Sequence, residues 1–204
     1  MRSIPSNTRS STALILVMMF LLADLILPQT LEGWTEFEDE ITPQRVVSTH
    51  TPSADTYISM AAPTSTYNTS VDGILSSGMM AESRLLLRFP MNFTSSDTIH
   101  SATLNLQCNT NDVAPADISI FAAEMKETWN GSYASWSIFA SNMPWAATGA
   151  DGASDRGVWE PSVKATGNGT VALNITSIAQ TTALNNLGNL SVIVSSLGAT
   201  YECS

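Results

Sequence analysis

The sequence predicts an all-β fold, because two neighbouring runs alternate between apolar and other side chains, with a short polar loop between them. In the first run, residues 84–89, one face carries Leu85, Leu87 and Phe89, and the other carries Arg84, Leu86 and Arg88. In the second run, residues 101–108, the apolar face carries Ala102, Leu104, Leu106 and Cys108. A period of two indicates strands with one buried face. Several such strands bury their apolar faces together in a two-sheet antiparallel sandwich of jelly-roll type.

The first 30 residues have the pattern of an export signal. Arg2 and Arg9 precede an apolar run from Ala13 to Ala23, which is followed by Asp24. This run is about half of the roughly 20 residues that cross a bilayer. Residues 1–30 are therefore predicted to be a cleaved signal peptide, with an uncleaved N-terminal anchor as the alternative. Either one directs the chain out of the cytosol, so we expect a secreted protein or one anchored at the cell surface.

The remaining elements follow in order. Residues 31–53 are rich in acidic side chains and contain two prolines, which is typical of a solvated linker or of a short edge segment. The predicted domain occupies residues 54–204. Clusters of Gly, Pro, Asn, Asp or Ser bound its six expected strands, which are Asp55–Met60, Arg84–Phe89, Ser101–Cys108, Asp117–Ala123, Gly169–Ile175 and Leu190–Ser196. A short helix is expected over Ile178–Leu184, capped by Asn174 or Thr176.

The charge balance excludes one class of partner. The formal net charge is −10 at pH 7, with only eight Lys and Arg residues. Nucleic-acid binding needs a cationic surface, so we expect no nucleic-acid partner. Membrane contact is expected only through an N-terminal segment that stays uncleaved.

Two kinds of motif fit an exported protein. Cys108 and Cys203 are expected to pair in an oxidising compartment, or else to be two separate small buried side chains. Six N-x-S/T sequons occur, at Asn68, Asn92, Asn130, Asn168, Asn174 and Asn189. Each falls in a predicted loop, on an outward strand face or at a strand entrance, so all six are candidate glycosylation sites. The alternative is a Ser/Thr-rich surface that carries no glycan.

Six motifs occur in order along the predicted domain. They are DTYI at 55–58, SRLLLRFPM at 83–91, SATLNLQC at 101–108, ETWNGSYASW at 127–136, GADGASDR at 149–156 and LNITSIAQ at 173–180. In this order and spacing they resemble the DNRLRE domain, a family also described as disaggregatase-related that overlaps a family of carbohydrate-binding modules. The resemblance covers about Ala54 to Cys203.

The resemblance implies a role as well as a fold. Such modules recur in large secreted archaeal and bacterial surface proteins and beside polysaccharide-degrading enzymes, which implies an accessory binding or adhesive role with carbohydrate as the ligand. It supplies no catalytic residue. Members of the family continue with a final strand after the segment that matches Gly198–Ser204, so we expect a truncated module. The sheet would then have an open edge, with unpaired backbone groups, at the missing strand.

The candidate ligand contacts lie in one segment. Four of the five tryptophans fall between Lys126 and Glu160. Two of them, Trp129 and Trp136, match framework positions of the family and are expected to pack onto the sandwich. The candidates for carbohydrate binding are two tryptophans that would stack on sugar rings and three polar side chains that would bond hydroxyls, namely Trp145, Trp159, Asn142, Asp151 and Asp155.

The sequence offers little for a metal or for catalysis. Asp151 and Asp155 are weak candidates for a structural calcium site, because their spacing is not that of an EF-hand, and no cofactor is expected. A carboxylate pair such as Asp151 and Glu160 would cleave a glycosidic bond only if the two faced each other across a cleft. No G-x-S-x-G motif or nucleophile–base pair occurs, and we expect no catalytic residue.

Three functional hypotheses follow. The first is a secreted or cell-surface, non-catalytic module that binds polysaccharide. The second is a structural or adhesive module of a surface layer or extracellular assembly, whose partners are other surface proteins and which has no small ligand. The third and weakest is a polysaccharide-degrading enzyme or an accessory to one. Exposed aromatic rings would favour the first hypothesis, and burial of all the tryptophans would favour the second.

Overall fold

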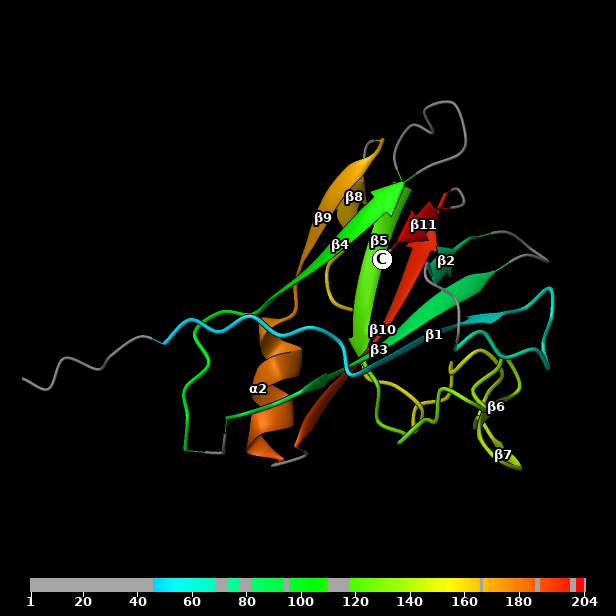
Figure 1. Cartoon of the computed structure of the whole chain (residues 1–204), viewed down its shortest axis with the longest axis horizontal. Helices are drawn as coiled ribbons and strands as arrows, with labels where there is room; N and C mark the ends of the chain where they lie inside the picture. Colours follow the sequence, from blue (N-terminus) through cyan, green and yellow to red (C-terminus); the bar gives the residue numbers. More distant parts are fainter. Residues whose placement is uncertain are drawn as a thin grey trace, which may run out of the picture. The chain divides into compact units, whose positions relative to one another are not determined.

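The alternating runs form the long strands of two antiparallel sheets in a computed structural model of the chain (Figure 1). The structure describes residues 46–68, 73–77, 82–93, 96–109, 118–165, 167–185, 188–198 and 201–203. The predicted signal segment and most of the predicted linker lie outside the described residues. The chain divides into two units, Met1–Val47 and Ser48–Ser204, and the second carries all the elements below. Within the described part of the chain, no helix is both long enough and apolar enough to span a bilayer.

The larger sheet, sheet A, has five strands and contains four of the six predicted ones. In spatial order its strands are β1 (Ala54–Ser59), β3 (Ser83–Pro90), β10 (Asn189–Leu197), β5 (Ile118–Glu124) and β8 (Val163–Ala165). The central strand β10 pairs antiparallel with both β3 and β5. Strands that are neighbours in this sheet are therefore far apart in the sequence.

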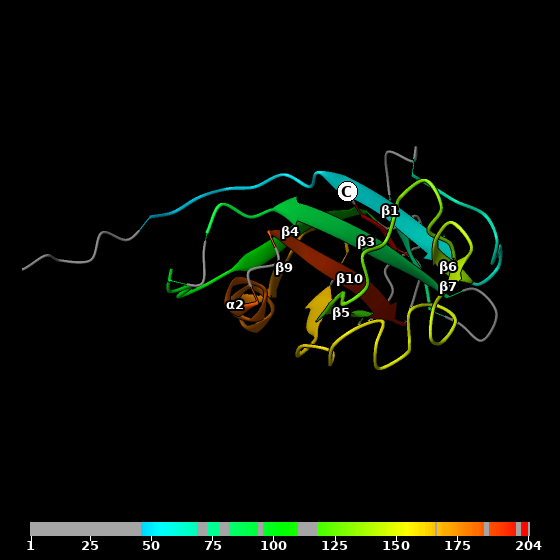
Figure 2. The same cartoon turned by 90° about the horizontal axis from the view of Figure 1, so that it is seen from below.

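The smaller sheet, sheet B, has four strands and contains the other two predicted ones. In spatial order its strands are β2 (Gly73–Leu75), β11 (Tyr201–Cys203), β4 (Thr103–Asn109) and β9 (Gly169–Asn174). A separate hairpin joins β6 (Ile138–Ala140) and β7 (Met143–Pro144). This hairpin and the single described helix, α2 (Thr176–Leu184), lie at opposite ends of the domain in both views (Figures 1 and 2). The all-β sandwich prediction, with one short helix, is confirmed.

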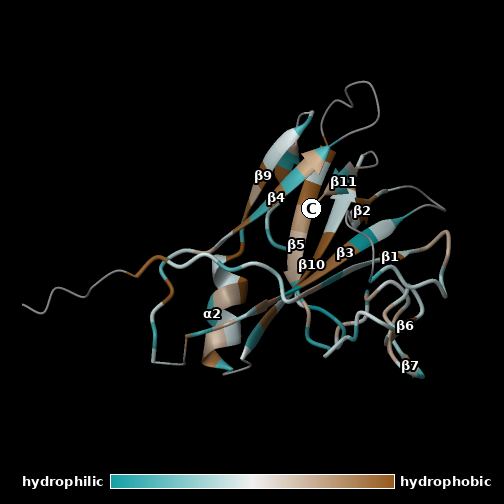
Figure 3. Ribbon diagram, in the orientation of Figure 1, coloured by the Kyte–Doolittle hydropathy of each residue, from teal (hydrophilic) through white to brown (hydrophobic). Residues whose placement is uncertain are grey.

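The two sheets enclose the main core. The inward residues of β3 and β4 alternate as predicted, and the alternation along β4 is visible in Figure 3. Leu75, Cys108, Ile118, Ile120, Val192 and Val194 are fully buried in this core. Burial of one large aliphatic side chain contributes about 1.5–3 kcal/mol relative to its exposed state. The apolar period of two therefore determines which face of each strand meets the other sheet.

Strand β3 departs from the half-buried pattern that its sequence predicts. Leu86 and Arg84 occupy its outer face, yet both are buried, at 0% and 5% exposure. Leu86 belongs to a second apolar cluster on the outer side of sheet A, together with Ile58 and Ile193. The segment between β5 and β8 covers this face with tryptophans, which is why a strand predicted to be half-buried is buried on both sides.

Helix α2 begins two residues before the predicted start and ends at the predicted residue. Its buried positions are Ile178, Ala179, Thr182 and Ala183. The N-cap is Ile175, which corrects the expected cap at Asn174 or Thr176. Asn174 contributes in another way, because its Oδ1 accepts a hydrogen bond from the backbone N–H of Thr176 at 3.0 Å. The amide oxygen thus stabilises the turn that leads from β9 into the helix.

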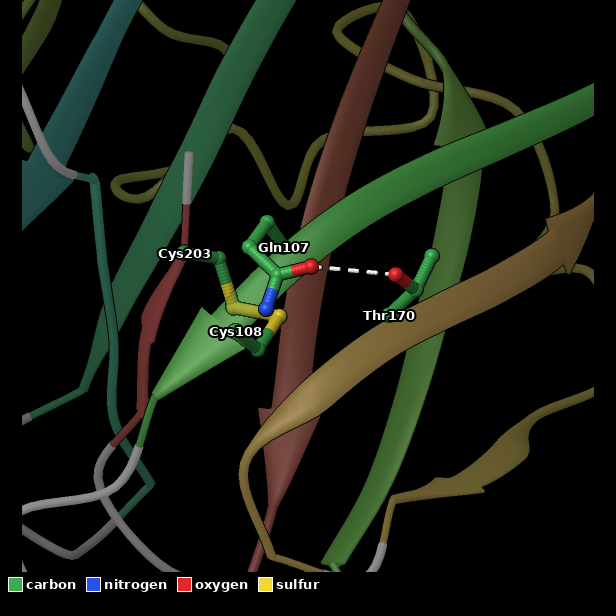
Figure 4. The surroundings of a disulfide bond; sticks show 4 residues. All are labelled: Gln107, Cys108, Thr170 and Cys203. Atoms are coloured by element: carbon green, nitrogen blue, oxygen red, sulfur yellow. Dashed lines mark hydrogen bonds between the residues drawn. A yellow bond between two sulfur atoms is a disulfide. The ribbon is translucent and has the colours of Figure 1, made fainter.

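The predicted cysteine pair is a disulfide. Cys108 of β4 and Cys203 of β11 lie opposite each other in adjacent strands and are bonded (Figure 4). Strand β11 pairs with β4 on one side and with β2 on the other. The last described strand therefore has a neighbour on each side within sheet B. A further strand beyond residue 204 stays a prediction.

Candidate functional site

The segment between β5 and β8 holds four tryptophans against the outer face of sheet A. Trp129, Trp136 and Trp145 are buried there, at 1%, 7% and 5% exposure. They pack in the second apolar cluster with Leu86 and Ile193 of the sheet. The prediction that Trp129 and Trp136 pack onto the sandwich is consistent with this burial.

Arg84 reaches from β3 into this layer and is almost fully buried. Its three guanidinium nitrogens donate to Oε1 of Glu82 at 2.8 Å, to the carbonyl of Gly149 at 2.6 Å and to Oδ2 of Asp151 at 2.9 Å. Its Cζ lies 5.2 Å from the ring centroid of Trp136. Burial alone would lower the pKa of Arg84, but the carboxylates of Asp151 and Glu82 outweigh burial and raise that pKa. Arg84 is therefore a fixed cation inside an apolar layer.

The loop whose carbonyl accepts a hydrogen bond from Arg84 requires glycine at position 149. Gly149 has a φ of +78°, and a Cβ built there would lie 2.6 Å from the Trp136 ring. The close approach brings the Gly149 carbonyl to the Arg84 guanidinium. This contact gives the Gly- and Asp-rich motif at residues 149–156 a structural role.

Asp151 connects the buried cation to the surface. Its Oδ2 accepts from Arg84, and its Oδ1 lies 2.8 Å from the guanidinium of Arg156. The Asp151 side chain is 42% exposed, whereas that of Arg156 is 17% exposed. Burial alone would raise the pKa of Asp151, but its hydrogen bonds to Arg84 and Arg156 outweigh burial and lower that pKa. Asp151 is therefore a stable carboxylate at neutral pH.

Trp159 lies at the margin of this layer and is half-buried. The Cζ of Arg156 lies 4.3 Å from the Trp159 ring centroid, and that of Arg84 lies 5.8 Å from it. The ring of Phe121, on the outer face of β5, is 6.3 Å from it in a tilted arrangement. The neighbouring Val158 is 87% exposed. Phe121, Arg156, Val158 and Trp159 form a mixed aromatic and cationic surface, which we call the Trp159 patch.

Two of the residues predicted to contact a ligand are parts of the framework instead. Trp145 is buried, and its indole N–H donates to the carbonyl of Ser135 at 2.8 Å, so its ring face is not available at the surface. Asp155 is 1% exposed, and its carboxylate accepts from the backbone N–H groups of Ala146, Ala147 and Gly152. Both expectations are corrected, because packing and backbone hydrogen bonds already occupy these side chains.

Asn142 is exposed and belongs to the β6–β7 hairpin, whereas Trp159 lies later in the segment, just before β8. Asn142 occupies the turn between β6 and β7 with a φ of 57°, a left-handed conformation that asparagine tolerates better than most residues. Among the five residues that were predicted to contact a carbohydrate, Asp151 and Trp159 both interact with Arg156.

The sequence places Arg84 and Arg88 on one strand face, where they are expected to balance acidic neighbours at the surface or to clamp an acidic polysaccharide. The structure instead stacks them on buried tryptophans. Arg84 and Arg88 point to the same side of β3, and Arg88 stacks over Trp129 with its Cζ 4.5 Å from the ring centroid. Burial lowers the pKa of Arg88, which also donates to the carbonyl of Trp129. Two arginines on one face of an otherwise apolar strand, with tryptophans later in the chain, were the available signal for this stacking.

Among the described residues, no group of three or more His, Cys, Asp or Glu side chains is arranged to hold a metal ion. The weak calcium candidates Asp151 and Asp155 are bound to arginines and to backbone N–H groups, respectively. The structural calcium therefore gains no support from these two carboxylates.

All six sequon asparagines are exposed. The fold brings two of them together, because Nδ2 of Asn68 donates to Oγ of Ser132, the hydroxyl residue of the Asn130 sequon, at 3.4 Å. Exposure permits glycan attachment at each site, and glycosylation itself stays a prediction.

The chain is similar to one known family over much of this structure. Residues 46–152 match the model of carbohydrate-binding module family 96. The matched part contains β1 to β7, Arg84 and the first three tryptophans of the layer, and it ends before Trp159. No curated protein matches the sequence.

Proposed function

Since the chain belongs to carbohydrate-binding module family 96, we propose that it is a non-catalytic module that binds polysaccharide through the Trp159 patch. We propose further that, within this group of carbohydrate-binding modules, the chain is a DNRLRE domain. The Asp151 carboxylate is not suited to act as a general acid, because Arg84 and Arg156 hold it in ion pairs and keep it ionised. A general acid for glycoside cleavage needs a raised pKa instead.

The half-buried ring of Trp159 is the observation that carries the proposal. Sugar rings present apolar C–H surfaces that pack on aromatic faces, while Asp151 and Arg156 beside the ring offer an acceptor and donors for hydroxyls. The other three tryptophans of the layer are buried and have no free face. Their burial and the cation stack hold Trp159 in position, so little side-chain entropy is lost on binding.

We propose that the module acts outside the cytosol, as a secreted or cell-surface protein. The Cys108–Cys203 disulfide supports this location, because disulfides persist mainly in oxidising compartments. The exposed sequons and the predicted signal segment point the same way. Other surface proteins are the alternative partners if the module is purely structural or adhesive.

Retention on polysaccharides tests the proposal. The full chain, Trp159→Ala and Tyr133→Ala are passed over immobilised neutral and anionic polysaccharides after circular dichroism has shown that each is folded. Tyr133 is a suitable control because it is an aromatic residue that is 47% exposed and lies outside the patch. We expect Trp159→Ala to lose at least about fivefold in affinity, since removal of an aromatic anchor typically costs more than about 1 kcal/mol. Tyr133→Ala is expected to bind like the parent protein.

Equal retention of both variants would remove the Trp159 patch as the site. Absence of retention of the folded parent protein on every polysaccharide would favour the structural or adhesive alternative.

A further inference from the structure

The outer face of sheet B is an exposed surface that the Trp159 patch does not use. Alternate residues of its strands β4 and β9 point away from the main core, and seven of these are exposed: Thr103, Asn105, Gln107, Asn109, Thr170, Ala172 and Asn174. We call these seven residues the amide face. Their inward neighbours Leu104, Leu106, Val171 and Leu173 are buried, which fixes the direction of the outward side chains.

The pairing register sets these side chains in rows. Thr103 lies opposite Asn174, Asn105 opposite Ala172 and Gln107 opposite Thr170. The hydroxyl of Thr170 donates to Oε1 of Gln107 at 3.0 Å across the two strands (Figure 4). From Thr103 to Asn109 the strand extends about 20 Å, at about 3.4 Å per residue. The amide face is therefore an extended, flat surface rather than a pocket.

None of the seven residues of the amide face is charged, although the whole chain has a formal net charge of −10. The face is bordered by one carboxylate, that of Glu202 on β11, which lies opposite Asn109 in the pairing register. Apart from the methyl group of Ala172, the exposed groups of the amide face are side-chain amides and hydroxyls. Each amide and each hydroxyl both donates and accepts hydrogen bonds. A ligand that matches this surface is uncharged and carries many groups that both donate and accept hydrogen bonds.

We propose that the amide face is a second polysaccharide-contact surface and that its ligand is a neutral polysaccharide. The inference rests on the proposed function, because it assumes that the module binds carbohydrate at all. A neutral polysaccharide is not repelled by the acidic protein. Its binding to this face also requires no desolvation of a charged side chain, because the seven residues carry none. An acidic polymer would gain no cationic partner among these seven residues. The Trp159 patch belongs to sheet A, so the two surfaces lie on opposite sides of the sandwich.

The test combines one double variant with two controls. Asn105→Ala/Gln107→Ala removes two exposed amides from the centre of the face. Gln180→Ala removes an exposed amide from α2, away from the face, and Trp159→Ala removes the aromatic ring of the other surface. All proteins are produced in a host that attaches no N-glycans, because a glycan on Asn174 would cover the face. Affinity electrophoresis with soluble neutral xylan, mannan and β-glucan, and with polygalacturonate, then measures binding.

We expect the double variant to bind a neutral polymer about tenfold more weakly than the parent protein, since each lost hydrogen bond reduces affinity a few-fold. Gln180→Ala is expected to bind like the parent, and polygalacturonate is expected not to bind through the amide face. Circular dichroism and thermal unfolding verify that the double variant is folded.

The outcomes separate this inference from the proposed function. If the parent binds and Trp159→Ala weakens binding while the double variant stays within twofold of the parent, the amide face is not a binding surface and the proposed function stands. If the folded parent binds none of the polymers, the proposed function and this inference both fail. If the parent is a dimer in sedimentation and the double variant is a monomer with unchanged binding, the amide face contacts a second copy of the chain and the inference is overturned.

Discussion

Asp151 neutralises the buried guanidinium of Arg84. Removal of the Asp151 charge should therefore destabilise the tryptophan layer around Arg84. We expect Asp151→Asn to lower the free energy of unfolding at pH 7 by about 1 kcal/mol, a value reduced for the partial exposure of the carboxylate. The pKa of Asp151 is lowered in the folded protein, so its ionised form stabilises the fold above the unfolded pKa of about 4. This contribution disappears as the pH falls below that value.

Urea unfolding of the parent protein and of Asp151→Asn between pH 7 and pH 2.5 measures both effects. The difference between the two proteins should shrink toward low pH. Asp55→Asn, which alters an exposed carboxylate on β1, serves as the control for general acid effects. A difference that stays constant with pH would show that the ion pairs of Asp151 do not contribute to stability.

The two tryptophans that the sequence treats alike should behave differently. Trp145 is fully packed, and we expect Trp145→Ala to destabilise the fold by about 3–5 kcal/mol through loss of burial and creation of a cavity. Trp159 is half-buried, so Trp159→Ala should cost less than about 2 kcal/mol. Thermal unfolding of both variants measures the contrast. Similar losses in the two would mean that Trp159 is as much a framework residue as Trp145.

Strand β11 is only three residues long and is held by the Cys108–Cys203 disulfide, which joins positions 95 residues apart. Closing so long a loop in the unfolded chain stabilises the fold by about 4–5 kcal/mol in the chain-entropy model. We expect Cys108→Ser/Cys203→Ser to lose most of this, and β2 and β4 to exchange their amide hydrogens faster once β11 is released. Denaturant unfolding and hydrogen exchange measure these changes. Unchanged exchange in β2 and β4 would show that backbone pairing alone holds β11.

Long strands were predictable from the sequence and short ones were not. The six predicted strands all occur, because each is long enough to stand out between clusters of turn residues, and most of them also show a period of two. Strands β2, β8 and β11 have three residues each, and β7 has two, so they show no period and form only because a neighbouring strand pairs with them. Helix α2 follows a strand directly, and the sequence located the helix but placed its start two residues late. Local patterns therefore located the long strands of both sheets but not the short ones.

The site was less predictable, because burial of a tryptophan depends on what the distant chain places over it. The sequence makes Trp145 and Trp159 equal candidates for stacking on a sugar. Only the folded segment shows that the indole N–H of Trp145 donates to the carbonyl of Ser135, whereas the ring of Trp159 remains partly accessible. The arginines that position Trp159 come from β3, about 70 residues earlier, and from the loop just before Trp159. Single-strand periodicity carries no information about such contacts across the domain.

The domain contains two apolar cores that share the strands of sheet A. Strand β3 contributes Leu85 to the core between the sheets and Leu86 to the tryptophan layer, and β10 contributes Val192 and Ile193 in the same way. Neither core can lose its strands without exposing the other. We therefore expect the domain to unfold in one cooperative step rather than as two separable layers.

Two spectroscopic signals separate the cores. Far-UV circular dichroism reports the sheets, and tryptophan fluorescence reports the outer layer, where Trp129, Trp136 and Trp145 are buried. Leu106→Ala, which alters only the core between the sheets, should destabilise the protein by about 2–5 kcal/mol. It should shift the urea midpoints of both signals equally, and Ile193→Val in the outer core should shift both by a smaller, equal amount. A fluorescence midpoint that stays in place while the circular dichroism midpoint moves in Leu106→Ala would mean that the tryptophan layer folds independently of the sandwich.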